Sequence, residues 1–162
     1  MKTLTMLMLG LGLTVSTLGN AAGLAVVDLA KVVENSTYLK QQNASLTQSI
    51  KPTSTKLEQL NKEIESLQQR AQSANQGDLQ KLSAQFQAKV NEFTTTQQGL
   101  QAKVQSSIQA SNNVFETRLK QAAEQLRKEN NVDFILNKNT VIASDAQYDL
   151  TDKMIQKINA MK

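Results

Sequence analysis

Two runs of apolar side chains, separated by Gly77 and Asp78, constrain the fold of this chain more than any other feature. The first run comprises Leu57, Leu60, Ile64, Leu67, Ala71 and Ala74, and the second comprises Leu79, Leu82, Phe86, Val90 and Phe93. Within each run the spacing is mostly three or four residues, which forms one stripe along an α-helix. Gly77 suits the left-handed residue that closes a helix, and Asp78 suits the cap that opens the next one. We therefore predict an antiparallel helical hairpin with facing stripes and its tip near Gly77.

The same periodicity extends the hairpin over residues 38–130. The first helix begins near Tyr38 and is interrupted at Pro52, where it either kinks or gives way to a new helix. The returning helix runs from Asp78 to about Asn130. Aromatic residues make up only 4% of the chain, which argues against a large globular core and favours long solvated helices. This part of the chain is predicted to be a long coiled-coil arm.

Residues 1–21 have the pattern of a cleavable export signal. Lys2 precedes a mostly apolar segment, residues 4–15, which is shorter than the roughly 20 residues that span a bilayer. Small residues then indicate cleavage after Ala21 or Ala22. The chain contains no Cys, so no disulfide supports it outside the cytoplasm. We predict an exported protein without a retained membrane anchor.

The segments that flank the arm, residues 22–37 and 131–162, form its predicted base. Residues 24–29 are a short apolar run typical of a buried strand. Residues 132–137 alternate apolar and polar side chains, and turn residues would join them to a second strand over 140–143. A last amphipathic helix follows. The predicted class is α+β, mostly α, with the long arm attached to a small β-containing body.

This body buries too little apolar surface to be stable by itself. The chain has neither Cys nor His, so neither disulfides nor the usual zinc sites can support it. Oligomerisation is the remaining support, with short strands that extend or close across subunits. The residues predicted for these oligomerisation strands are Val26, Val27, Phe134, Ile135, Leu136, Val141 and Ile142. Several arms would then project from one shared body.

The sequence gives little support to catalysis. Without His or Cys there is neither an imidazole base nor a thiol nucleophile, and the glycines after the export signal are too scattered for a phosphate loop. Asp149 and Asp152 are better explained as helix caps than as a cation site. No platform of aromatic and basic residues for nucleic acid is present. We predict a protein without enzymatic activity, metal, cofactor or nucleic-acid ligand.

The order of strand, short helix, helical hairpin, β-hairpin and closing helix resembles the Skp (OmpH-like) family of periplasmic chaperones. The matching segments are LAVVD at 24–28, VDFIL at 132–136 and YDLT at 148–151, and the resemblance covers essentially the whole chain after the export signal. It implies a periplasmic homotrimer with a β-barrel body and three arms around a cavity. It further implies that this cavity holds unfolded outer-membrane β-barrel proteins, without ATP, and prevents their aggregation.

The charge of the arm bears on how such a client would be held. Residues 40–130 carry 12 basic and 8 acidic side chains, which would attract acidic clients and anionic membrane surfaces weakly. The outer part, residues 51–89, is less basic than the resemblance implies, so polar and apolar contacts are expected to matter more than charge. The candidate client-contact residues are Leu82, Phe86, Val90, Phe93, Lys81 and Lys89. The periodicity favours the alternative that the four apolar residues form the seam between the two helices.

A second function class also fits the arm: an envelope structural or adhesive coiled coil that binds no unfolded client. Any coiled coil shows the helical repeat, so the arm alone does not separate the two classes. The patterned strands of the base favour the chaperone, because a plain fibre needs no such body.

Pro52 and Gly99 are predicted to form a hinge part-way along the arm. In an ideal hairpin folded at Gly77, the two residues lie at nearly the same height, and both are poor helix formers. Replacing both with Ala should narrow the range of arm angles measured by small-angle X-ray scattering, because each helix would gain stability at that height. An unchanged range would exclude the hinge.

Overall fold

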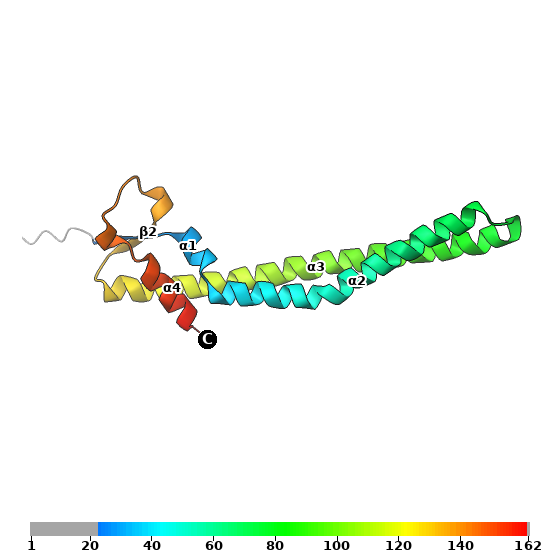
Figure 1. Cartoon of the computed structure of the whole chain (residues 1–162). Helices are drawn as coiled ribbons and strands as arrows, with labels where there is room; N and C mark the ends of the chain where they lie inside the picture. Colours follow the sequence, from blue (N-terminus) through cyan, green and yellow to red (C-terminus); the bar gives the residue numbers. More distant parts are fainter. Residues whose placement is uncertain (1–22, 162) are drawn as a thin grey trace, which may run out of the picture.

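The computed structural model describes residues 23–161 as a long two-helix arm on a small α/β body (Figure 1). Its elements are β1 (Leu24–Val27), α1 (Leu29–Glu34), α2 (Thr37–Gln72), α3 (Gln76–Glu129), β2 (Phe134–Asn137), the 3-10 helices η1 (Lys138–Thr140) and η2 (Ala146–Tyr148), and α4 (Thr151–Ala160). The predicted class, mostly helical α+β with a helical-hairpin arm, is confirmed. The export signal predicted for residues 1–21 lies outside the described residues. Between residues 23 and 161, no helix has both the length and the apolar character needed to cross a bilayer.

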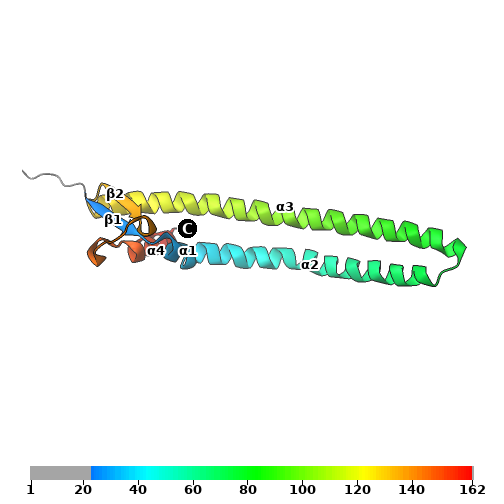
Figure 2. The same ribbon diagram turned by 90° about the horizontal axis from the view of Figure 1, so that it is seen from above.

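The arm consists of α2 and α3, which run antiparallel along its whole length (Figure 2). Leu60, Leu67 and Leu82 are buried toward the tip, and Phe115 is buried at the root. α2 continues through Pro52 rather than ending there, and its ribbon changes direction part-way along (Figure 1). Proline removes one main-chain N–H from a helix, which bends it without ending it when the flanking turns are kept.

The chain reverses direction close to Gly77, at residues 73–75, but the capping residues predicted there are wrong. α2 ends at Gln72, and Asn75 rather than Asp78 is the cap of α3. The Asn75 side chain accepts from the N–H of Asp78 at 3.0 Å and donates to the Asp78 carboxylate at 2.9 Å. This reciprocal pair satisfies a free donor at the helix start and places an acidic group near its positive end. Gly77 therefore lies in the first turn of α3, with no left-handed backbone.

The body forms around β1, which is bonded along both edges. β2 pairs with it in parallel, with Leu24 opposite Phe134. On the other edge, the N–H of Leu150 donates to the carbonyl of Val26 at 2.9 Å. α4 packs against the root of α3, against α1 and against β1, and β2 also contacts α3 (Figure 1). The buried core comprises Ala25, Val27, Val32, Phe115, Ala122, Leu126, Leu150, Met154 and Ile158.

The β-hairpin predicted within the body is wrong. β2 runs parallel to β1, and the segment after η1 forms no strand, so Val141 and Ile142 lie in a loop. Local hydrogen bonds explain the difference: the Asn137 side chain accepts from the N–H of Asn139 at 3.2 Å, and the Thr140 hydroxyl donates to the Asn137 carbonyl at 2.7 Å. These bonds compete with strand pairing and turn the chain into η1.

Gly77→Ala should stabilise the protein by about 0.5–1 kcal/mol, because Ala is favoured over Gly inside a helix. A Cβ at this position would meet only the Asn75 side-chain oxygen, at an ordinary 3.5 Å. The companion variant Asn75→Ala removes the cap and should cost about 1 kcal/mol. Thermal unfolding followed by circular dichroism measures both changes. Destabilisation by Gly77→Ala would contradict the observed tip and favour a left-handed Gly77.

Candidate functional site

The body presents an open sheet edge beside exposed apolar side chains. Of the two strands in the described chain, β1 is bonded on both sides, whereas β2 is paired along one edge only. Phe134 on β2 and Tyr148 on η2 are 56% and 49% exposed. A groove beside the sheet is lined by Leu24 of β1, by Leu136 of β2, and by Val141 and Tyr148 of the segment that follows, among others. An unpaired edge next to apolar surface is a place where a further strand can add.

A charged contact fixes the end of β2 relative to the start of α4. Lys138 Nζ lies 2.7 Å from Asp149 Oδ2, and the other carboxylate oxygen of Asp149 accepts from the N–H of Thr151 at 2.9 Å. The Lys138 contact, followed by Thr151, lowers the pKa of Asp149 to about 2, and the same ion pair raises the pKa of Lys138. The N–H of Asp28 donates to the Thr151 hydroxyl at 2.9 Å. Together these contacts connect β2, β1 and α4.

The residues predicted for the oligomerisation strands fall into two groups. Val26 and Val27 are buried within the subunit, and Ile135 packs against its core, so these three side chains stabilise the subunit itself. Phe134 and Leu136 are exposed on β2, and Val141 and Ile142 are in the loop that follows η1. That the predicted residues form an interface between subunits stays a prediction, and it now rests mainly on those residues that are exposed.

The apolar residues predicted to contact a client lie in the upper arm, the part nearer the tip, and are at least partly buried. Leu82 is buried, and Phe86, Val90 and Phe93 are partly buried. This burial fits the seam between α2 and α3 better than a free contact surface, because client-binding side chains need to be accessible. Of the two predicted lysines, Lys81 is exposed.

Lys89, the second predicted lysine, is held by ion pairs within the upper arm. Its Nζ lies 2.7 Å from Glu63 and 3.5 Å from Glu92, and Lys56 lies 2.8 Å from Glu92. The hydrogen bond to Glu63 is the main cause of the raised pKa of Lys89, and the hydrogen bond from Lys56 is the main cause of the lowered pKa of Glu92. Exposed pairs of this kind contribute little to stability, but they cancel charge that would otherwise attract a client.

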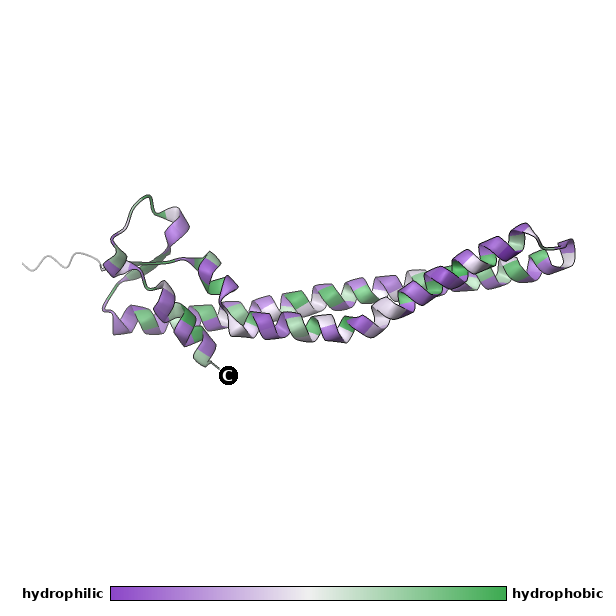
Figure 3. Ribbon diagram, viewed as in Figure 1, coloured by the Kyte–Doolittle hydropathy of each residue, from purple (hydrophilic) through white to green (hydrophobic). Residues whose placement is uncertain are grey.

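The part of the arm nearer the body, which we call the lower arm, carries almost no charge over residues 41–50 and 93–115. Lys103 is the only charged residue between positions 93 and 115, and positions 41–50 have none. No side chain of residues 37–59 or 83–114 is fully buried, and apolar groups such as Ile108 and Val114 are exposed there. Apolar and polar residues alternate along the ribbon of both helices (Figure 3). Packing is therefore closest at the two ends of the arm and looser between them.

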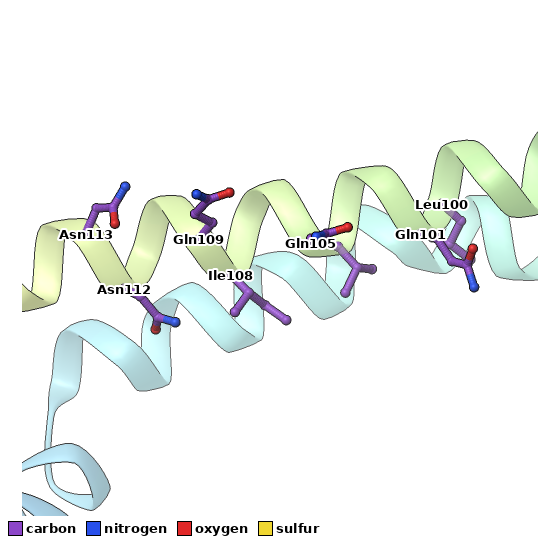
Figure 4. A pocket seen from close by; sticks show the side chains of 8 residues that line it. Leu100, Gln101, Gln105, Ile108, Gln109, Asn112 and Asn113 are labelled. Carbon is purple, nitrogen blue, oxygen red and sulfur yellow. The ribbon is translucent and has the colours of Figure 1, made fainter.

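An open groove of about 1050 Å³ runs along α3 in this neutral stretch (Figure 4). It is lined by two rows of residues four apart, Leu100, Val104, Ile108 and Asn112 in one row and Gln101, Gln105, Gln109 and Asn113 in the other. A second groove shares Ile108 and Asn112 and extends toward the body past Leu39 and Leu46. The two grooves therefore form one continuous surface from the middle of the arm to its root, uncharged along α3 and bordered by Glu34 and Lys40 at the root.

The predicted hinge residues lie between two links that join the helices. Lys103 Nζ on α3 donates to the carbonyl of Ser49 on α2 at 2.9 Å, on the body side of both residues. The Lys56 ion pair to α3 lies on their tip side. Pro52 and Gly99 thus share one stretch of the arm, and a Cβ at Gly99 would meet no atom within 4 Å. Bending at this stretch stays a prediction.

Comparison with known proteins decides the family. The family model described as "Outer membrane protein (OmpH-like)" matches residues 23–158. The chain belongs to the OmpH-like family. A Skp-like protein of Pseudomonas aeruginosa is 23% identical over 143 residues, which cover 86% of this chain and 85% of the relative. The crystal structure of an OmpH-like outer membrane chaperone from Caulobacter crescentus shares the fold, with a TM-score of 0.72 at 20% identity over 86% of this chain and 85% of that one.

The carboxylates of this OmpH-like chain are in part held in ion pairs. Over residues 23–161, no three His, Cys, Asp or Glu side chains gather as metal ligands. The carboxylates with lowered pKa are each paired with a neighbouring cation, as in Glu124, whose pKa falls to about 2 beside Arg127 and Lys128. Such pairs hold surface charges in place on a helix.

Sequence reasoning missed the amide-lined groove of this family member. The contact residues predicted from the sequence were apolar side chains and lysines nearer the tip, whereas the groove lies nearer the body and is lined by apolar and amide side chains. The available signal was the run of four-residue spacings from Leu100 to Asn113, in which each Gln precedes an apolar residue or Asn by three positions.

Proposed function

We propose that this OmpH-like protein is an ATP-independent periplasmic holdase that binds unfolded outer-membrane β-barrel proteins between its arms. The arms would project from a homotrimeric body, and the client would be held there until membrane insertion. The observation that carries the proposal is an open sheet edge on a small body, combined with a long arm whose lower half exposes uncharged apolar surface.

The open edge supports assembly. A two-stranded sheet with exposed Phe134 and Leu136 along its free side has surface left for strands from other copies. The loop that carries Val141 and Ile142 lies next in sequence and exposes Ile142 completely. Pairing of such segments around a three-fold axis would cover the apolar side chains and close the sheet edges.

The arm supports client binding. Unfolded barrel proteins alternate apolar and polar residues and aggregate through exposed strands. Several mobile arms offer many weak contacts, whose combined effect exceeds that of any single one. Ion pairs within the upper arm neutralise part of its charge, so electrostatic attraction contributes less to client binding in this proposal. Contact with anionic membrane surfaces is weak for the same reason.

The test is dilution of a urea-unfolded outer-membrane β-barrel protein into buffer with and without this protein, in the absence of ATP, followed by light scattering. The proposal predicts suppressed scattering near one trimer per client, because each cavity would hold one chain. Serum albumin at equal mass is the control for non-specific protection. Scattering that stays as high as with albumin would contradict the proposal and favour a structural coiled coil.

A further inference from the structure

The second row of the groove on α3 has hydrogen-bonding capacity that the arm itself leaves unused. Gln101, Gln105 and Gln109 are exposed, and in the part of the chain that the structure describes their side-chain amides bond to no other residue. Gln87, nearer the tip, instead donates to Asn91 at 3.0 Å. Each free amide offers two donors and an acceptor directly beside the apolar row.

The spacing of the two rows matches that of an extended chain. Residues four apart on a helix recur every ~6 Å. Alternate residues of a β-strand, which point to the same side, recur every ~6.6–6.8 Å. Over three repeats the difference stays near ~2 Å, which a Gln side chain can accommodate by changing rotamer. The rows also turn by about 40° around the helix axis at each step. A strand that coils along α3 with this turn can place every second side chain on the apolar row and its main chain on the amide row.

The absence of charge selects what the groove can hold. Lys103, the one charged residue of this stretch, already donates to the Ser49 carbonyl across the arm. A charged side chain of a client would lose water in the groove without gaining an ionic partner, which is unfavourable. An uncharged segment with apolar alternate residues loses nothing of this kind.

We propose that the groove binds an extended, uncharged segment of the unfolded client in which every second residue is apolar. The client's apolar side chains pack on Leu100, Val104 and Ile108, and its main-chain N–H and C=O groups bond to the glutamine row. This inference rests on the proposed holdase function and identifies the part of the client that is recognised. It also predicts that binding depends little on salt, unlike capture by lysines.

The first experiment compares two double variants of the full-length mature protein. Gln105→Glu with Gln109→Glu introduces charge into the groove and removes amide donors. Gln97→Glu with Gln98→Glu adds the same charge at exposed positions of α3 outside the groove lining. Titration with a fluorescently labelled, urea-unfolded outer-membrane β-barrel protein should show affinity about tenfold weaker for the first pair and unchanged for the second.

The apolar row is tested in the same assay by Ile108→Ser. Val114→Ser is the matched control, because Ile108 and Val114 are similarly exposed, at 47% and 42%, and only Ile108 lines the groove. Thermal unfolding of every variant verifies that the fold is kept. Wild-type affinity should change by less than about twofold between about 0.05 and about 0.5 M NaCl.

The outcomes separate the inference from the proposed function. If the wild-type protein binds the client and the groove variants bind equally well, or both charge pairs weaken binding alike, the groove assignment is overturned while the holdase stands. If affinity falls steeply with salt, capture by charge replaces the groove. If the wild-type protein binds no client, the holdase function fails and the inference fails with it.

Discussion

Main-chain N–H and C=O groups need hydrogen-bond partners, and no strand of the described chain pairs with the outer edge of β2. Phe134 and Leu136 of the same strand also expose apolar surface. The opposite edge of β1 is already occupied by Leu150, so the sheet can grow in one direction only. In the proposed assembly the same edge sets the symmetry, the covering of the apolar side chains and the direction in which the arms project.

The arm is attached to that body, but its two helices are held together in a different way. Its two helices pack closely where Leu60, Leu67 and Leu82 meet near the tip and where Phe115 meets the body. Between these ends, the long helices are kept together by a few polar links and by half-buried side chains. Because the two helices pack closely at both ends of the arm and loosely between them, apolar and amide groups stay accessible while the helices stay together, which suits the proposed binding and release of an unfolded chain.

The hairpin could be predicted from the sequence because its apolar stripes repeat over many residues and tolerate a local error. The tip and the second strand each depend on a few residues, and competition between local hydrogen bonds determines their structure. Asn75 gains a reciprocal bond with Asp78 that the Gly77–Asp78 pair does not offer. Val141 and Ile142 have high strand propensity, but the bonds of Asn137 turn the chain away before they can pair. The partner of β2 instead lies more than 100 residues earlier, at β1.

Sedimentation equilibrium of the protein without residues 1–21, at micromolar concentration and neutral pH, distinguishes the proposed trimer from a monomer. We expect a single species of three subunits, because the open edge of β2 and the apolar side chains around it need other copies to cover them. A folded, stable monomer under these conditions would contradict it, since one arm on a self-sufficient body encloses no cavity.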